Sequence, residues 1–460
     1  MKKSFLNPLA VAALGAVLFV SSCKDKDNGP ELPANYVEAT DAATGRSSYV
    51  VSGSTGTQTW KKDRVYVLDG FVFVSEGETL TIEPGTVIKG KPGVGEESSA
   101  LIVARGGKII ANGTAAAPII FTAEADKLDG NLGKNRGLWG GLIVLGKSRL
   151  NTVPTTKAIE GIPTSETRGS YGGSDDADNS GILRYVSIRH GGTEIGAGNE
   201  INGLTLGGVG SGTTVEYVEV FANEDDGIEY FGGTVNTKYI IASHCGDDAL
   251  DYDQGYRGLN QFSFVYQETA TGDRGSENDG GTDPEDGKPY ATPMFVNATF
   301  VGNGLSDKRC ITFRDNGAGE YHNSVFIDFG RGVDIELDVK AATCTFDRFN
   351  DKTLKLENNI FSKVAGDVAA SVFTVSADSL AKASPRFAPA VADLKAYFTS
   401  AGNTVGGISV TRTNVVPAST PGALSKPSNS FFSPANYKGA FEPGKSPWYA
   451  GWTATEKFIK

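Results

Sequence analysis

Residues 223–253 read NEDDGIEYFGGTVNTKYIIASHCGDDALDYD, and this stretch contains nearly the same phrase twice. DDGIEY, which begins at Asp225, returns 22 residues later as DDALDY, which begins at Asp247. Each copy alternates apolar and polar residues, as a strand with one buried face does. A strand that repeats at this spacing is typical of a solenoid, because a single coil cannot bury its apolar face without a neighbour. The stretch therefore predicts stacked β-coils.

Similar strand-like runs recur along most of the chain, at intervals of one coil or of one coil plus a loop. They are YVSI at 185, YVEV at 217, YIIA at 239, FSFV at 262, FVNATF at 295, YHNSVF at 321 and LENNIF at 356. Glycine, asparagine, aspartate and proline separate the runs, as expected between short strands. The pattern predicts an all-β solenoid whose parallel strands stack about 4.8 Å apart.

Several phrases resemble a group of bacterial surface lipoproteins that has no assigned activity. They are LTIEPGTVIKG, GLWGGLIVLGK, SGILRYVSIRHGG, NYKGAFEPG and WYAGWT. The resemblance implies a right-handed parallel β-helix of the pectin-lyase-like type. Right-handed coils also follow from the general chirality of parallel crossovers.

The N-terminal residues predict export and lipidation. Lys2 and Lys3 precede the apolar run LAVAALGAVLFV, which fits a signal peptide and is too short to span a bilayer. The sequence VSSC, which ends at Cys23, resembles a bacterial lipobox, and KDKDN after it resembles a tag for the outer face of the outer membrane. We therefore expect Cys23 to carry lipid and the protein to be an outer-membrane lipoprotein at the cell surface.

Composition divides the chain into four expected segments. They are a signal peptide at 1–22, a flexible tether at 23–45, the parallel β-helix at 46–362 and a C-terminal capping region at 363–460. Apolar residues at helical spacing after Pro389 predict one short helix in the last segment. Its many aromatic residues are expected to cap the open end of the solenoid. A platform that stacks against sugars is the alternative.

The net charge limits the class of partner, and the cysteine count limits the possible disulfides. The formal net charge is −11, which disfavours nucleic acid and repels polyanions unless cations intervene. After Cys23, three cysteines remain, Cys245, Cys310 and Cys344, so at least one cannot pair within the chain. No zinc-type spacing is present, and we interpret these three as small buried residues.

The acidic repeat has two non-catalytic interpretations. Aspartate often accepts hydrogen bonds from the backbone of its own turn, so the acids could simply mark corners of the coil. Stacked coils also bring like charges together, and a divalent cation relieves their repulsion. Calcium prefers 6 to 8 oxygen ligands, which makes it the candidate cofactor. The candidate ligands are Asp225, Asp226, Asp247, Asp248, Asp251 and Asp253.

The third interpretation is catalysis. Polygalacturonases share the β-helix and place one catalytic aspartate in N-T-D-G and two more in G-D-D. Here NEDDG and GDD place Asp226, Asp247 and Asp248 one coil apart, as hydrolysis by paired carboxyl groups requires. The G-H-G histidine and R-I-K clamp of that family have no counterpart after Asp248. A lyase would need a base such as Arg257 or Arg314, and the spacing singles out neither.

Residues 268–289, ETATGDRGSENDGGTDPEDGKP, look like a long polar insertion between coils, where binding residues often lie. Together these features predict a lipid-anchored β-helix of the cell envelope with a binding or structural role, adhesin-like or glycan-binding. The expected partners are the membrane, through the lipid, and a polysaccharide or cell-surface glycan. A polysaccharide-degrading enzyme is the alternative.

Overall fold

The computed structural model describes residues 32–196 and 199–459. Pro33–Lys460 forms one compact unit, and the predicted signal peptide and Cys23 lie outside the described residues. No helix in the described part of the chain is long and apolar enough to cross a membrane.

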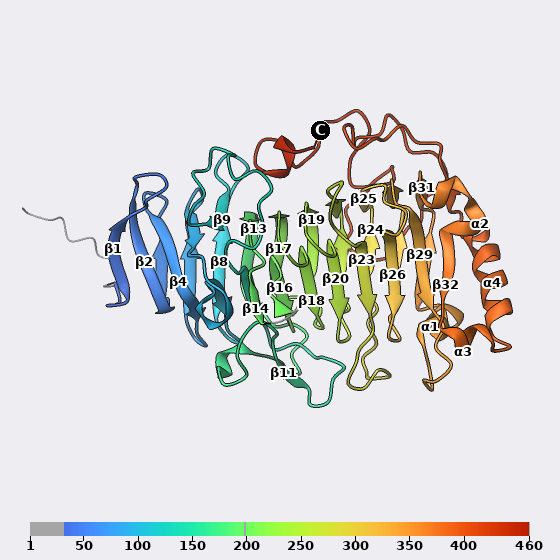
Figure 1. Ribbon diagram of the computed structural model, residues 1–460, viewed down its shortest axis with the longest axis horizontal. Coiled ribbons are helices and arrows are strands. Elements are labelled where there is room, and N and C mark those ends of the chain that lie inside the picture. Colours follow the sequence, from blue (N-terminus) through green and yellow to red (C-terminus); the bar gives the residue numbers. More distant parts are fainter. Residues whose placement is uncertain (1–31, 197–198, 460) are drawn as a thin grey trace, which may run out of the picture. The chain divides into compact units, whose positions relative to one another are not determined.

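Three parallel sheets run along the stack of coils, and successive coils add one strand to each sheet (Figure 1). Sheet 1 contains the second half of β4 (Val65–Val74), β7 (Ala100–Val103), β10 (Leu142–Leu145), β16 (Leu204–Gly207), β18 (Ile228–Phe231), β20 (Leu250–Asp253), β23 (Arg274–Asp279), β26 (Arg309–Arg314), β29 (Arg331–Glu336) and β32 (Phe373–Ser376). Sheet 2 contains β3 (Gln58–Trp60), β5 (Thr79–Ile82), β8 (Lys108–Asn112), the first halves of β13 (Gly181–Arg189), β17 (Thr214–Phe221) and β19 (Asn236–Ser243), then β21 (Leu259–Gln261), β24 (Met294–Val296), β27 (Gly319–His322) and β30 (Leu354–Glu357).

Sheet 3 lies between the other two along each coil. It contains β2 (Ser47–Ser54), the first half of β4, β6 (Val87–Gly90), β9 (Ile119–Ala123), the second halves of β13, β17 and β19, then β22 (Phe264–Tyr266), β25 (Thr299–Val301), β28 (Val325–Ile327), β31 (Ile360–Ser362) and β33 (Thr404–Val405). Two short antiparallel pairs lie in loops: β11 (Thr156–Ala158) with β12 (Ser170–Gly172), and β14 (Glu194–Gly196) with β15 (Asn199–Glu200). The fold is the predicted right-handed parallel β-helix.

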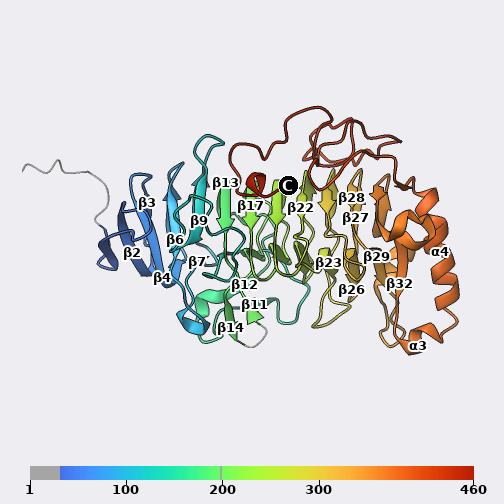
Figure 2. The ribbon, with the colours of Figure 1, turned by 45° about the horizontal axis from the view of Figure 1, so that its top comes forward.

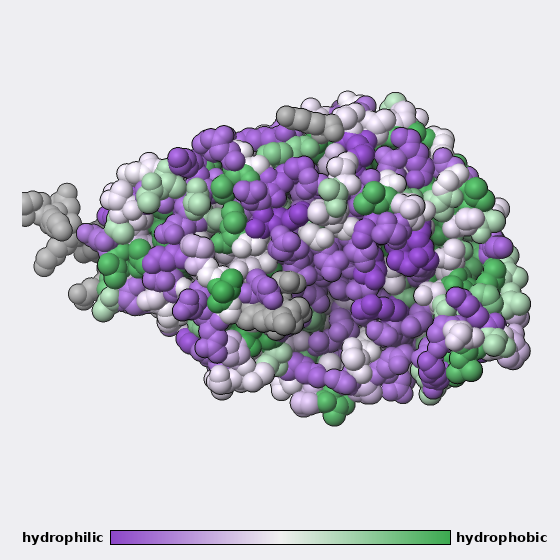
Figure 3. All heavy atoms as spheres, viewed as in Figure 1, coloured by the Kyte–Doolittle hydropathy of each residue, from purple (hydrophilic) through white to green (hydrophobic). Residues whose placement is uncertain are grey.

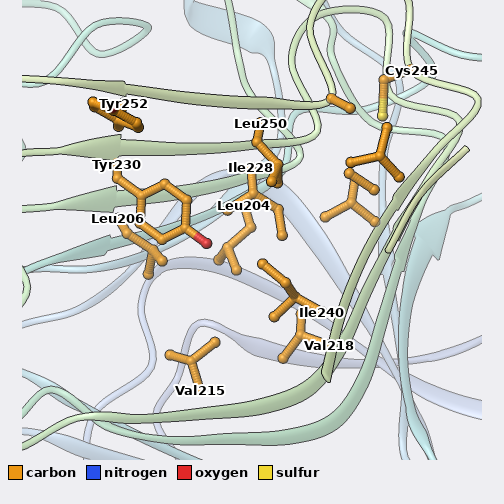
Figure 4. Packing of buried hydrophobic residues seen from close by; sticks show 14 of the residues in the cluster. Leu204, Leu206, Val215, Val218, Ile228, Tyr230, Ile240, Cys245, Leu250 and Tyr252 are labelled. Carbon is orange, nitrogen blue, oxygen red and sulfur yellow. The ribbon is translucent and has the colours of Figure 1, made fainter. Parts of the chain in front are cut away.

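The two copies of the opening repeat are adjacent coils in the predicted register. Ile228 pairs with Leu250 and Tyr230 with Tyr252 in parallel strands of sheet 1. All four side chains point into the interior, where they are at most 1% exposed (Figure 4). The residues between them therefore point outward, because side chains alternate along a strand.

Aromatic residues stack at the corner between sheets 2 and 3. Tyr185, Tyr217, Tyr239 and Phe262 occupy this corner in four successive coils, with positive φ angles between 47° and 60°. Neighbouring rings lie 4.4 to 4.9 Å apart. A left-handed conformation costs a non-glycine residue about 1–2 kcal/mol, and ring stacking offsets part of that cost.

The C-terminal tail, residues 406–459, runs back along the side of the coils rather than across their end (Figure 2). Trp452 packs edge-on against Tyr185 at 5.4 Å, and Trp448 packs against Tyr239 at the same centroid distance. The expectation that the aromatic residues of the tail cap the open end is therefore wrong. The tail instead covers the stacked tyrosines along the flank.

A buried carboxylate binds the last part of the tail. Glu219 of β17 is 0% exposed and accepts hydrogen bonds from the backbone N–H groups of Ala454 (2.9 Å) and Thr455 (2.7 Å). It also accepts hydrogen bonds from the hydroxyl groups of Thr455 and Ser187. We call this set of contacts the Glu219 clamp.

Helices cover the end of the stack. They are α1 (Thr345–Asn350), α2 (Ala369–Val372), α3 (Ser379–Lys382) and α4 (Phe387–Ser400). The predicted helix after Pro389 is α4, which buries Leu394 and Phe398. Phe398 contacts Phe373 of β32 edge-on at 5.1 Å. Strands β32 and β33 also continue sheets 1 and 3 beyond residue 362, where we expected the coils to end.

Two further segments differ from expectation. The predicted tether contains β1 (Tyr36–Thr40), which pairs antiparallel with β2 and covers that edge of the sheet. The predicted insertion at 268–289 contains β23, a regular strand of sheet 1. Its inward positions are the polar residues Ser276 and Asn278. The Ser276 hydroxyl donates to Asn278 Oδ1 (2.7 Å), and the Tyr321 hydroxyl donates to Ser276 (3.0 Å). Hydrophobic periodicity therefore misses this strand.

The three cysteines of the coils are buried and form no disulfide. Cys245 and Cys310 belong to the hydrophobic core of the coils, as does Cys344 near the end of the stack. Burial raises the pKa of the Cys245 thiol to about 12, which makes it a poor nucleophile. These residues act as the small apolar side chains that the sequence predicts.

Candidate functional site

Carboxylates form a row on the outward face of sheet 1. The register aligns Glu229 of β18 with Asp251 of β20 and Glu277 of β23. Glu229 and Glu277 are only 8% and 7% exposed, although they face away from the interior. Figure 3, in the orientation of Figure 1, shows a hydrophilic area over this part of the sheet. We call these three residues, with Asp226 and Asp248 in the turns before β18 and β20, the acidic ladder.

The two turn aspartates tie successive coils together. The Asp248 backbone N–H donates to Asp226 Oδ1 (2.9 Å), and the Arg274 backbone N–H donates to Asp248 Oδ1 (2.5 Å). Asp226 and Asp248 are 7% and 2% exposed. Each carboxylate thus accepts a hydrogen bond from the next coil, so part of the acidic repeat has an architectural role.

The ladder contains two overlapping triads of carboxylates. One oxygen from each of Asp226, Glu229 and Asp251 lies within 4.8 Å of the others. The same holds for Asp248, Asp251 and Glu277. Asp251 belongs to both triads, so it is the centre of the ladder.

Arginines neutralise only the second triad. Arg274 Nη1 lies 3.1 Å from both Asp248 and Glu277, and Arg314 Nη1 lies 3.1 Å from Glu277. Among the described residues, no lysine, arginine or histidine forms an ion pair with Asp226, Glu229 or Asp251. The negative charge of the first triad therefore has no balancing cation in this part of the chain.

The pKa values reflect this crowding. Burial raises the pKa of Asp226, Glu229 and Asp251 well above the ordinary carboxylate range, and neighbouring carboxylates raise it further. For Asp226 the main neighbour is Asp248, and for Asp251 it is Asp226. Either protons or a cation must therefore relieve the repulsion.

Two buried oxygen atoms at the first triad have no hydrogen-bond donor among the described residues. One is Asp251 Oδ1 and the other is Asn202 Oδ1. Asn202 is 1% exposed, and its Nδ2 donates to Glu229 Oε2 and to Glu160 Oε1 (2.9 Å), which fixes its orientation. Buried polar atoms normally have a partner, and both of these are oxygens, the atom type that binds calcium.

The remaining predicted ligands lie around the ladder. One oxygen each of Asp225 and Asp247 comes within 4.8 Å of one of Asp226. Asp247 is exposed, and Asp253 lies in β20, where burial and then Asp279 raise its pKa to about 7. The structure thus brings Asp226 and Asp251 together in the first triad, and Asp247 and Asp253 belong to neither triad of the ladder.

Sequence reasoning missed Glu229, Glu277 and Asn202. The signal for Glu229 was present, because it stands between Ile228 and Tyr230 as Asp251 stands between their counterparts. Glu277 was hidden in the segment interpreted as an insertion. Asn202 Oδ1 lacks a donor among the described residues because the Asn202 amide is oriented by Glu160, which lies in a loop distant in sequence. The sequence around Asn202 does not show this contact.

The residues of the hydrolase and lyase interpretations are poorly placed for catalysis. Asp226 and Asp248 are buried and bonded to backbone, so only Asp247 is open to a substrate. Arg257 pairs with Asp176 (3.1 Å) away from the ladder. Burial alone would lower the pKa of Arg314, but its hydrogen bonds with Asp279 raise it overall, so Arg314 holds its proton too firmly to act as a base.

Comparison with known proteins identifies a family with the same fold. A family model described as a pectate-lyase like beta helix domain matches residues 53–397. No curated protein matches the chain at a significant level. The crystal structure of the Dettilon tailspike protein matches over 70% of this chain and 62% of that chain, with 10% identity and a TM-score of 0.28. The chain therefore spans less than two thirds of that protein, and so distant a likeness does not bear on function.

Proposed function

Because the chain belongs to the pectate-lyase-like β-helix family, we propose that its acidic ladder is a cation-dependent binding surface for a glycan at the cell envelope. The family gives the scaffold but not the activity, since one fold hosts unrelated functions. The ligand class comes from the chemistry of the ladder. Oxygen atoms on a rigid sheet suit a hard divalent cation, and such a cation can also coordinate the hydroxyl or carboxylate oxygens of a saccharide.

The observation that carries the proposal is the first triad. Asp226, Glu229 and Asp251 have no cationic side chain beside them among the described residues, and Asp251 Oδ1 is buried without a donor. Three carboxylates and the carbonyl of Asn202 can supply most of the 6 to 8 oxygens that calcium prefers. The second triad already has Arg274 and Arg314, so we assign the ion to the first.

Calcium should raise the melting temperature of the purified protein, and EDTA should lower it. A ligand at a hundredfold excess over its Kd stabilises the folded state by about 2.7 kcal/mol. Asp251→Asn should remove most of this calcium-dependent increment, because it removes the residue shared by both triads. In a glycan-binding screen, retention should require calcium and should be lost in the same variant.

The matched control is Asp334→Asn. Asp334 lies in the same outward row of sheet 1, but Arg309 and Arg331 pair with it. This variant should lower the melting temperature and leave the calcium-dependent increment unchanged. An increment that is absent in the native protein, or that persists in Asp251→Asn, would mean that backbone hydrogen bonds alone satisfy the ladder. Release of reducing ends from a bound polysaccharide would instead favour the hydrolase alternative.

Lipid anchoring through Cys23 is part of the same proposal and is supported by the lipobox-like sequence. Cys23→Ser should move the protein from the membrane fraction to the soluble fraction, because lipidation requires that thiol. Fractionation followed by immunoblotting measures the shift. A Cys245→Ser variant is the control, since that buried thiol should not affect localisation. Membrane association that is unchanged in Cys23→Ser would refute the anchor.

A further inference from the structure

A pocket of about 240 Å³ lies at the turn after β19, on the side of sheet 3. Its walls include His244 and Tyr266 from the coils, Lys134 and Glu268 from loops, and Arg412 and Phe458 from the C-terminal tail. It is separate from the acidic ladder, and its charges have the opposite sign.

His244 gives the pocket a buried and unsatisfied nitrogen. The residue is 2% exposed, and its ring lies 5.2 Å from the rings of both Phe221 and Tyr266. Its Nδ1 has no hydrogen-bond partner among the described residues. Burial, together with the nearby charges of Lys134, Arg412 and Arg136, lowers the pKa of His244 to about 3, so the ring is neutral near pH 7. A neutral ring that carries its hydrogen on Nδ1 can donate to an anion.

Positive charge around His244 exceeds negative charge. Arg412 donates to the carbonyl groups of Gln267 (2.6 Å) and Gly302, and it stacks over Tyr266 at 4.6 Å. It forms no ion pair with a carboxylate in the described part of the chain. The pocket walls thus contain two cations, Lys134 and Arg412, and one carboxylate, Glu268, which pairs with Lys134. Arg136, just outside the walls, pairs with both Glu268 and Glu224.

We propose that this pocket binds an oxyanion group of a small ligand, either a carboxylate or a phosphate or sulfate ester. The unpaired charge of Arg412 and the ammonium group of Lys134 would neutralise the ligand. His244 Nδ1–H would fix its orientation with a hydrogen bond. The pocket volume limits the anchored part to a small group. This site is independent of the proposed cation site, so either can be tested without the other.

Isothermal titration calorimetry of the purified protein with sodium sulfate, phosphate or acetate, at ionic strength held constant with sodium chloride, tests the site. We expect saturable binding of at least one anion. Arg412→Gln should weaken it at least tenfold. His244→Phe should weaken it several-fold, because it keeps the aromatic packing and removes the nitrogen. Arg149→Gln, at an exposed arginine paired with Asp176, is the matched control and should bind as the native protein does.

The three anions also distinguish the ligand class. Preference for acetate indicates a carboxylate ligand, and preference for phosphate or sulfate indicates an ester. Arg412 also holds the tail through two carbonyl groups, so Lys134→Gln provides a second variant that leaves the tail anchored. Absence of saturable binding for all three anions would overturn the proposal. So would affinity that is unchanged in both His244→Phe and Lys134→Gln.

Discussion

Leu250→Asp is expected to destabilise the protein by more than about 4 kcal/mol, the range of a charge buried without a partner. Leu250 is 1% exposed and stacks in register between Ile228 and Ser276 of the neighbouring coils. An aspartate there would lie in the hydrophobic core of the coils without a cationic partner, and the solenoid cannot expose it without separating two coils. Thermal unfolding followed by circular dichroism measures the loss.

Leu250→Met is the matched control, because a volume-conserving apolar change in a core costs less than about 1.5 kcal/mol. The outward neighbour Asp251→Asn supplies a second comparison at the same coil. A melting temperature that is unmoved by Leu250→Asp would mean that this residue faces solvent. The register of sheet 1, and with it the outward direction of the acidic ladder, would then be wrong.

Glu219→Ala is expected to release the C-terminal tail from the coils. The carboxylate accepts hydrogen bonds from Ala454, Thr455 and Ser187, and hydrogen bonds to a charged group are worth about 1.5–3 kcal/mol each. Their loss should weaken tail docking by at least about 3 kcal/mol. Trp448 and Trp452 should become more exposed, with red-shifted fluorescence, and limited proteolysis should cut within 406–459. The β-sheet signal in circular dichroism should change little.

Glu216→Ala is the control for this experiment. Glu216 lies on the same strand, but its carboxylate forms a partly exposed ion pair with Arg184 (2.9 Å) and, among the described residues, has no hydrogen bond or ion pair with the tail. Its removal should leave both the fluorescence and the proteolytic pattern as in the native protein. A protease-resistant tail in Glu219→Ala would show that its other contacts, among them the aromatic packing and the hydrogen bonds of Arg412, hold it without the clamp.

The repeat was enough to predict the coils and their register. Ile228 and Leu250 align as expected because a period of one coil and an alternation of two residues leave few ways to bury the apolar face. β23 escaped detection because Ser276 and Asn278 replace apolar side chains inside the coil. The local sequence pattern cannot reveal that Ser276 accepts a hydrogen bond inside the coil from Tyr321, which belongs to a later coil.

The candidate site was only partly predictable for a similar reason. The sequence indicates that Asp226 and Asp248 stack, since both precede equivalent strands. The sequence does not indicate which acids lack an arginine partner, because the two arginines that pair with Glu277 come from two different coils. The path of the C-terminal tail along the coils could not be predicted from the sequence either. Glu219 and Thr455 are 236 residues apart, and no local signal connects them.

The Glu219 clamp has a consequence for the order in which the protein matures. Residues 454 and 455 are synthesised long after β17, so the stacked aromatic corner stays uncovered while the later coils emerge. Until then, Tyr185, Tyr217 and Tyr239 lack the cover that Trp448 and Trp452 give them in the complete fold. Docking of the tail ends that interval. The Glu219 clamp can therefore form only after residue 455 has been added to the chain.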